Sequence, residues 1–313
     1  MRRKIIRQGH NTYTVSLPKK WCDNHGLKEG HEIDIGEKGE CLMLSKEAYR
    51  GTGEIAVDIT GLDRSTIIIL IESLYTYGYD KINITTKDSK VKYYMFDKEL
   101  SVQSVVRNAI DLLIGAEIVS SSKNKYEIAV MTEDSREKFD MTLRRIFLLI
   151  IDLHDSFLEG ITKKDKGLTE AVDLQHASIM KFINYALRLL NKFGYEDADK
   201  TTFYFSMINY LHRVERIPKN ITGYVVENLK LGKKTCDIIE EIFREFKDYY
   251  EVFYKYDVKK ISAINTKRDL LKVKIFHQEY KNLTKDEIFV LSSFSNILDE
   301  IVGLCEMRMA IEH

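Results

Sequence analysis

The feature that most constrains the fold is the spacing of apolar residues in the C-terminal half. In residues 139–157, apolar side chains recur at alternating intervals of four and three residues, and residues 203–224 and 239–256 repeat this pattern. Such spacing places one apolar stripe along a helix, where it packs into a core. The chain contains only two prolines, Pro18 and Pro218, so long helices can run without interruption over most of its length.

Breaks in the helical pattern divide residues 135–312 into six predicted helices. They fall near residues 160–167, 194–199, 232–234, 256–258 and 282–284. Short connections favour antiparallel neighbours, so we expect two three-helix units in tandem, over residues 135–231 and 233–312 of a helical domain at 133–313. Pro218 falls within the third helix and predicts a kink there.

The two preceding segments have different textures. Residues 51–132 alternate predicted strands and helices, and Asp63 is placed to cap a helix over Arg64–Tyr77. The other expected elements are strands at 55–59 and Lys81–Thr85, a helix at 102–113, and a hairpin of strands 116–120 and 126–130. This is a small α/β unit.

Residues 1–50 are β-rich, with strands at 13–17, 32–35 and 41–44, a turn at 36–39 and a short helix at 19–25.

Charge is balanced overall but uneven along the chain. The 48 Lys and Arg residues equal the 48 Asp and Glu residues, which excludes a globally basic nucleic-acid coat. Residues 1–50, however, carry 10 cations against 7 acids, and the first twenty residues hold six cations and no acid. Such a cluster is typical of a surface for nucleic acid or another anionic partner; the alternative is a solvated terminus.

Other features narrow the class of protein. No signal peptide and no apolar run of membrane-spanning length is found, so we expect no membrane insertion. The four cysteines are scattered without a C-x-x-C pair, which fits a cytoplasmic protein. There is no phosphate-binding loop and no nucleophile–base pattern, so we do not expect an enzyme.

The N-terminal segment resembles the AbrB/MazE/SpoVT swapped-hairpin DNA-binding domain. The resemblance rests on Tyr13-Thr14-Val15-Ser16-Leu17-Pro18 before the short helix, and on Gly26-Leu27-Lys28-Glu29-Gly30 after it. His31 stands where the family usually has Asp. The resemblance implies a β-barrel formed by two interleaved chains, hence a homodimer, with basic residues around the first strand facing DNA. A segment of this size is also small for an independent core.

The residues expected to contact DNA are basic side chains around the first strand and one amide. The first candidates are Arg2, Arg3, Lys4 and Arg7, followed by Asn11, Lys19 and Lys20. Arginine can read guanine and asparagine adenine, but no base preference follows from the sequence. We expect Trp21 to pack in the core of this domain.

The rest of the chain resembles archaeal PhoU-like phosphate uptake regulators that carry this N-terminal domain. The matching segments are Gly61-Leu62-Asp63, the stretch from Tyr75 to Ile82, the stretch from Leu113 to Val119, and the tandem three-helix pattern. The resemblance implies a protein that connects phosphate status to transcription or to a transporter.

PhoU bundles often bind iron or zinc through a Glu/Asp-x-x-x-Asp motif on one helix of each repeat. Here the expected acids fall on His212 and Arg216, and on Ser295 and Asp299. An arginine in a ligand position opposes a metal ion, so we expect no cofactor. Should iron or zinc bind, the candidate ligands are Asp299, His212, His176 and Asp173.

Two other histidine positions have simpler explanations. His176, in Asp173-x-x-His176, falls on an apolar seam, where a hydrogen-bonded core histidine is the favoured interpretation. Asp152, His154 and Asp155 are expected to form a solvated helix face.

Two functional hypotheses follow. The first is a dimeric DNA-binding transcriptional regulator of the PhoU type, concerned with phosphate uptake or signalling. The second is an adaptor that does not bind DNA, whose bundles dock a phosphate transporter ATPase or a sensor kinase and whose N-terminal domain only dimerises.

Overall fold

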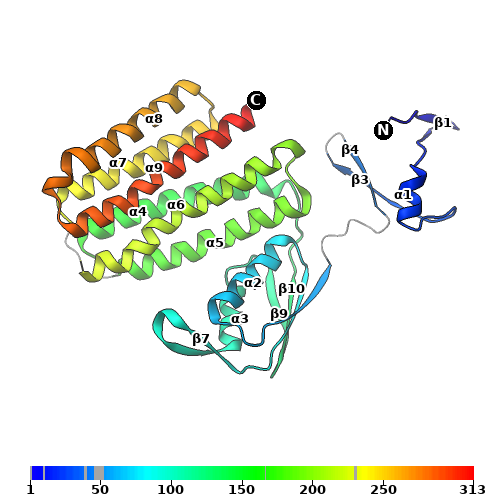
Figure 1. Ribbon diagram of the computed structural model, residues 1–313, viewed down its shortest axis with the longest axis horizontal. Helices are drawn as coiled ribbons and strands as arrows, with labels where there is room; N and C mark the ends of the chain where they lie inside the picture. Colours follow the sequence, from blue (N-terminus) through cyan, green and yellow to red (C-terminus); the bar gives the residue numbers. More distant parts are fainter. Residues whose placement is uncertain (1, 10, 39–40, 46–52, 166, 229–230) are drawn as a thin grey trace. The chain divides into compact units, whose positions relative to one another are not determined.

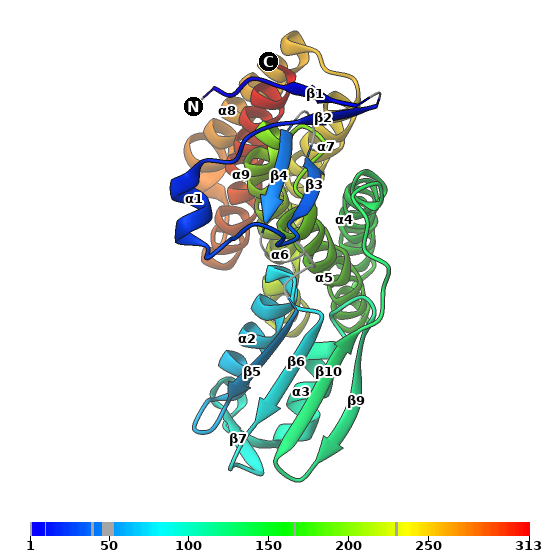
Figure 2. The same ribbon diagram turned by 90° about the vertical axis from the view of Figure 1, so that its right-hand side faces the viewer.

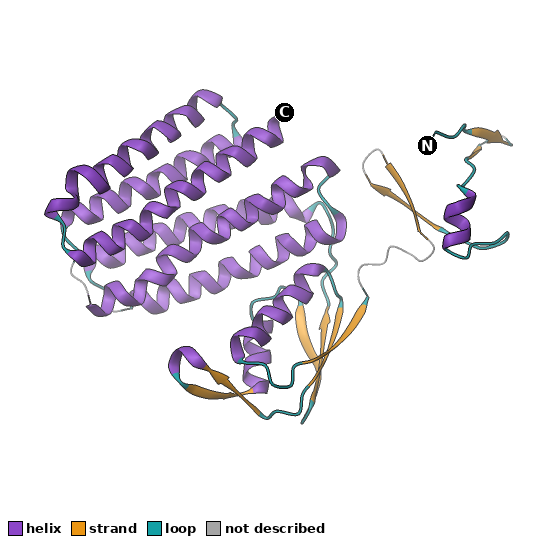
Figure 3. Cartoon of the chain, viewed as in Figure 1, coloured by secondary structure: helices purple, strands orange, loops and turns teal. Residues whose placement is uncertain are grey.

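A computed structural model describes the chain except for residues 1, 10, 39–40, 46–52, 166 and 229–230. The chain divides into two compact units, residues 1–50 and residues 51–313. The second unit combines an α/β part with a helical C-terminal part, so the chain is a multidomain protein of mixed class (Figure 3).

Residues 1–50 contain short strands and one short helix. Strand β1 pairs with β2 in an antiparallel hairpin, and β3 pairs with β4 in a second one. The elements are β1 Ile6–Gln8, β2 Thr12–Thr14, α1 Lys19–Asn24, β3 Asp34–Lys38 and β4 Cys41–Ser45. The predicted helix is confirmed. The strand predicted at 13–17 is shorter and ends at Thr14, and β3 begins two residues later than expected. The end of the turn predicted at 36–39 lies outside the described residues.

The α/β part is built on a four-stranded mixed sheet in the order β5-β6-β10-β9, whose strands lie side by side in Figure 2. Strand β5 is parallel to β6, and the remaining neighbours are antiparallel. The elements are β5 Glu54–Asp58, α2 Arg64–Tyr77, β6 Lys81–Thr85, α3 Val102–Ile110, β9 Ala116–Ser122 and β10 Lys125–Val130. Alternate residues of β6 are buried, including Ile82 and Ile84, so one face of the sheet packs on the core.

Local chemistry explains the boundaries of α2. Asp63 Oδ1 accepts hydrogen bonds from the Ser65 N–H at 2.8 Å and the Thr66 N–H at 3.3 Å, which satisfies donors of the first turn. Gly78 ends the helix at a φ of 120°, a backbone conformation that favours glycine. The predicted cap, helix and following strand are therefore confirmed.

The sequence did not reveal a second hairpin, formed by β7 Lys90–Tyr93 and β8 Lys98–Ser101 around a 3₁₀ turn at Tyr94–Phe96. Its tip is strongly exposed: Tyr94 is 76% and Met95 is 78% accessible. Strand β7 does alternate, as Lys90-Val91-Lys92-Tyr93 with Val91 buried, but four residues are a short run, and the apolar residues of the adjoining turn obscure where the strand ends.

Long helices, α4 to α9, make up most of the described C-terminal part (Figure 1). Helices α4, α5 and α6 contact one another, as do α7, α8 and α9, and the two groups meet through contacts of α6 with α9 and of α4 with α7. The bounds are α4 Lys138–Lys163, α5 Leu168–Phe193, α6 Thr201–Asn228, α7 Lys233–Tyr254, α8 Val258–Val273 and α9 Lys285–Glu312. The six predicted helices and their breaks are confirmed, although α8 is shorter than expected and is followed by a π-helical segment, Lys274–Glu279. Helix α6 continues through Pro218, and the kink stays a prediction.

A buried arginine joins the α/β part to the bundle. Arg188 of α5 has no exposed surface, and its guanidinium donates to the carbonyl oxygens of Tyr75 at 3.0 Å and Tyr79 at 2.8 Å. It also pairs with Asp80 and with Asp134, the latter at 2.9 Å. Lys192 bonds both carboxylates from one turn further along α5. A buried charge with this many partners is well compensated, and it fixes α2 against α5.

Candidate functional site

The predicted DNA-contacting residues lie at the start of the chain. Arg2, Arg3 and Lys4 precede β1, Arg7 lies within it, and all four are exposed. Asn11 directly precedes β2, and Lys19 and Lys20 are the first residues of α1; these three are exposed as well. The side chains are therefore available to an anionic partner such as a phosphate backbone.

Residues 1–50 have no core of their own among the side chains that the structure describes. None of those side chains is classed as buried, and Trp21, expected in the core, is only half-buried. Several apolar side chains are mostly exposed: Ile5 (72%), Tyr13 (70%), Leu42 (66%), Ile35 (63%) and Ile6 (61%). Exposed apolar side chains contribute little hydrophobic stabilisation to an isolated unit. We therefore expect another protein surface to cover them.

The metal candidates divide between two places. Asp299 of α9 pairs with Lys272 at 2.6 Å and with Arg268 at 3.7 Å, so its charge is balanced by cations. Asp173 of α5 pairs with Lys219 of α6. Within the described part of the chain, no group of three or more His, Cys, Asp or Glu residues has an arrangement that could hold a metal ion.

His176 and His212 instead meet at a carboxylate that sequence reasoning missed. Glu215 of α6 has no exposed surface; its Oε2 lies 2.8 Å from His176 Nδ1, and its Oε1 lies 3.7 Å from His212 Nε2. The His176 side chain is 24% exposed, so it has the hydrogen-bond partner expected of a core histidine but sits at the edge of the core. Glu215 lies three residues after His212, so the His-x-x-Glu spacing was the available signal.

Burial dominates the titration of this cluster. It raises the pKa of Glu215, against the opposing effect of His176. Burial, together with the nearby Arg216, His176 and Arg213, lowers the pKa of His212 to about 4. Glu72 of α2 also faces His176, and burial raises its pKa. These side chains form a polar cluster between α5 and α6, in which Glu215 Oε2 has a hydrogen-bond partner and Glu215 Oε1 has none.

The expectation that His154 lies on a solvated helix face is wrong. Asp152 and Asp155 are exposed as predicted, but His154 between them is fully buried. Its ring stacks on Phe243 of α7, with centroids 3.9 Å apart, and burial lowers its pKa to about 3. The reason is geometric: α4 packs against α5, α6 and α7, so its buried arc is wider than a single stripe.

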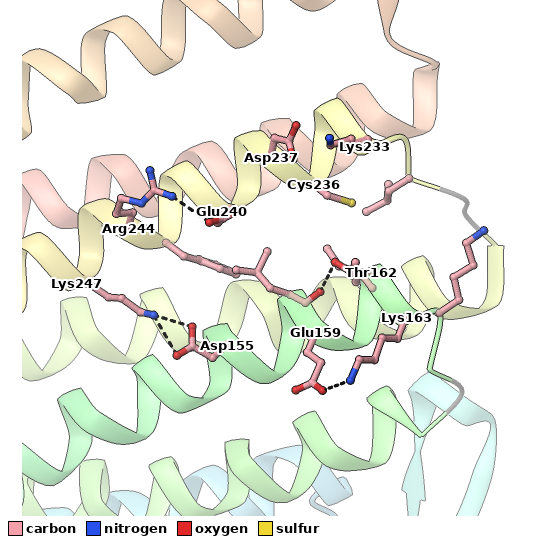
Figure 4. A pocket seen from close by; sticks show the side chains of 15 residues that line it. Asp155, Glu159, Thr162, Lys163, Lys233, Cys236, Asp237, Glu240, Arg244 and Lys247 are labelled. Carbon is pink, nitrogen blue, oxygen red and sulfur yellow. Dashed lines mark hydrogen bonds and ion pairs between the residues drawn. The ribbon is translucent and has the colours of Figure 1, made fainter.

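A groove of about 700 Å³ lies between α4 and α7 (Figure 4). Leu158 and Ile161 of α4, Phe243 of α7 and Leu231 before α7 supply its apolar lining, and charged side chains of both helices surround them. Sequence reasoning did not point to this groove, because its walls come from residues about 80 positions apart whose charges read as ordinary solvated helix faces.

Comparison with known proteins identifies no relative: no protein-family model, no curated protein and no solved structure matches the chain.

Helix α9 is long and apolar enough to cross a membrane by length and composition alone. It contacts α6, α7 and α8, and 56% of its most apolar window is buried within the structure. A core helix of a soluble protein passes the same test, and these contacts assign α9 to the core of the bundle.

Proposed function

We propose that the protein is a dimeric, DNA-binding transcriptional regulator of the PhoU type. The observation that carries the proposal is the N-terminal segment: six exposed cations with no acid in the first twenty residues, on a unit whose apolar side chains are also exposed. A second copy, interleaved as a swapped-hairpin barrel, would cover the apolar side chains. The same two-fold arrangement would double the cations on one surface.

The helical part supplies the regulatory half of the proposal. Two mutually packed groups of three helices are compatible with the tandem repeat of PhoU proteins. The link to phosphate uptake or phosphate signalling, the cytoplasmic location and the absence of enzymatic activity rest on the resemblance and the sequence pattern, and they belong to the proposal. In this account a partner or ligand binds the bundle and shifts how two DNA-contacting units are held.

DNA binding is tested with a matched pair of variants. R2A/R3A/K4A/R7A removes four cations from the proposed interface. K123A/K181A/K259A/K285A removes four exposed cations from elsewhere, and the structure gives these lysine side chains no ion-pair partner among the described residues. We expect wild type and the control variant to bind random duplex DNA in fluorescence anisotropy at low salt, and the first variant to bind at least tenfold more weakly.

The alternative, an adaptor that docks a phosphate transporter ATPase or a sensor kinase, predicts a different result. In that case the chain would form dimers by sedimentation velocity but would not bind duplex DNA at low salt. Equal affinity of the two variants for DNA would also count against the proposed interface.

A further inference from the structure

The α4–α7 groove has the size of a small-molecule binding site, and its two ends differ in charge. Its volume of about 700 Å³ falls within the range of ligand pockets. It runs from an ion pair between Asp155 and Lys247, with an N–O distance of 2.7 Å, to Lys164 and Lys233, because the two helices are antiparallel here. Lys164, which directly follows α4, lies nine positions after Asp155, which gives a length of about 14 Å.

The floor of the groove is apolar and firmly supported. Phe243 is 1% exposed and is held from behind by the stacked ring of His154 and by Phe294, whose centroid is 5.5 Å away. Burial raises the pKa of the half-buried Cys236 thiol, so this side chain is a neutral, apolar part of the lining. An apolar chain or ring can therefore lie along this floor without losing hydrogen bonds.

The charges of the groove favour one anionic group at one end. Five cations and four carboxylates line it. Three of the cations are paired along the walls: Lys247 with Asp155, Arg244 with Glu240 and Lys163 with Glu159 (Figure 4). Lys164 and Lys233 have no acidic partner among the described residues. Asp237, one turn after Lys233, is the fourth carboxylate.

We infer that the groove binds an amphipathic anion, with an apolar chain along Leu158, Ile161 and Phe243 and a carboxylate or phosphate monoester head group between Lys164 and Lys233. The cations along the walls are already paired with Asp155, Glu159 and Glu240, so a ligand that carries negative charge along its length gains little there, which argues against polyphosphates and nucleic acid. Two lysines at one end, with no acidic partner among the described residues, and an apolar floor behind them suit a fatty acid or an alkyl phosphate.

Binding would connect the two halves of the bundle. The groove takes one wall from the α4–α6 group and the other from the α7–α9 group, so an occupied groove adds contacts between them. A ligand that binds only this packed state raises the melting temperature progressively as the ligand concentration exceeds its Kd, with a logarithmic dependence on concentration. This inference does not depend on the proposed DNA binding.

The test uses short-chain probes in isothermal titration calorimetry with the full chain: decanoate, decyl phosphate, the neutral decanol, acetate and inorganic phosphate. We expect decanoate or decyl phosphate to bind, decanol to bind at least tenfold more weakly, and the bare head groups to bind more weakly still. A preference for decyl phosphate would point to a phospholipid-derived ligand, and a preference for decanoate to a free fatty acid.

Two variants complete the test. K164A/K233A is expected to weaken decanoate binding about tenfold and to leave decanol binding unchanged, whereas the control K181A/K259A changes neither. C236W, which fills the groove from α7, is expected to abolish binding of both, with circular dichroism verifying the fold. Failure of wild type to bind either amphipathic anion, or equal decanoate affinity of wild type and K164A/K233A, would overturn the inference.

Discussion

At the residue scale, the most informative side chains are polar groups that the fold buries. His154 is the clearest of them, because neither ring nitrogen has a hydrogen-bond partner and the ring is stacked on Phe243. Burial lowers the pKa of His154 to about 3, well below the ordinary value of 6.5. Between these two pH values the unfolded chain binds a proton that the folded chain does not, so stability falls as the pH drops through this window.

We therefore predict that H154F reduces the loss of unfolding free energy that wild type shows as the pH falls below 7. Phenylalanine keeps the stacked ring and removes two unpaired nitrogens, so the variant should be at least as stable as wild type at pH 7. At pH 5 the wild type should have lost about 2 kcal/mol through this group and the variant none of it. Urea unfolding of both proteins at the two pH values measures this. A constant difference in unfolding free energy between them would contradict the account.

The cluster at Glu215 gives a second prediction. His176 supplies the closest partner of this buried carboxylate, so H176A should leave it without a hydrogen bond and lower the free energy of unfolding by about 2–3 kcal/mol. Adding E215Q removes the charge and should restore part of that loss. If the double variant is less stable than H176A by the full cost of E215Q alone, the two side chains are not coupled.

At the scale of elements, the contact of α6 with α9 depends on a glycine. Gly303 of α9 is buried, and a Cβ atom added there would lie 2.2 Å from Cε1 and 2.3 Å from Cζ of Tyr210 on α6. Such distances force the ring to shift, and Arg213 now lies over that ring with its Cζ 4.4 Å from the ring centroid. The glycine is thus a requirement of close helix packing.

This contact predicts that G303A lowers the stability of wild type but raises the stability of a Y210A variant. In wild type, G303A should destabilise the protein by about 1–2 kcal/mol, because overpacking outweighs the better helix propensity of alanine. In a Y210A background the space is open, and G303A should stabilise by up to about 1 kcal/mol. Thermal or urea unfolding of the four proteins gives the cycle; destabilisation of equal size in both backgrounds would refute the steric explanation.

Much of this level could be predicted from the sequence. The Asp63 cap, α2, β6 and the five breaks between the long helices follow from local signals that tertiary contacts do not override. The β7–β8 hairpin was missed because each strand has only four residues and exposed apolar residues fill the 3₁₀ turn between them. His154 and Glu215 were missed because α4 and α6 each touch three other helices, and a single stripe underestimates what such a helix buries.

At the scale of the whole molecule, the two compact units differ in their charge and in their apolar core. Residues 51–313 bury an extensive apolar core, whereas residues 1–50 expose apolar side chains and cations together. A balanced net charge of zero is therefore compatible with a locally basic N-terminal surface. We propose that DNA binds to this basic surface, which a dimer would present twice.

The salt dependence of DNA binding tests this claim most directly. If two copies together present several phosphate-contacting cations, log Kd plotted against log salt concentration should have a slope of magnitude about 4 or more between about 50 and 200 mM salt. R2A/R3A/K4A/R7A should reduce that slope by at least half, and K123A/K181A/K259A/K285A should leave it unchanged. No binding by wild type at about 50 mM salt, or the same slope for wild type and R2A/R3A/K4A/R7A, would contradict the account.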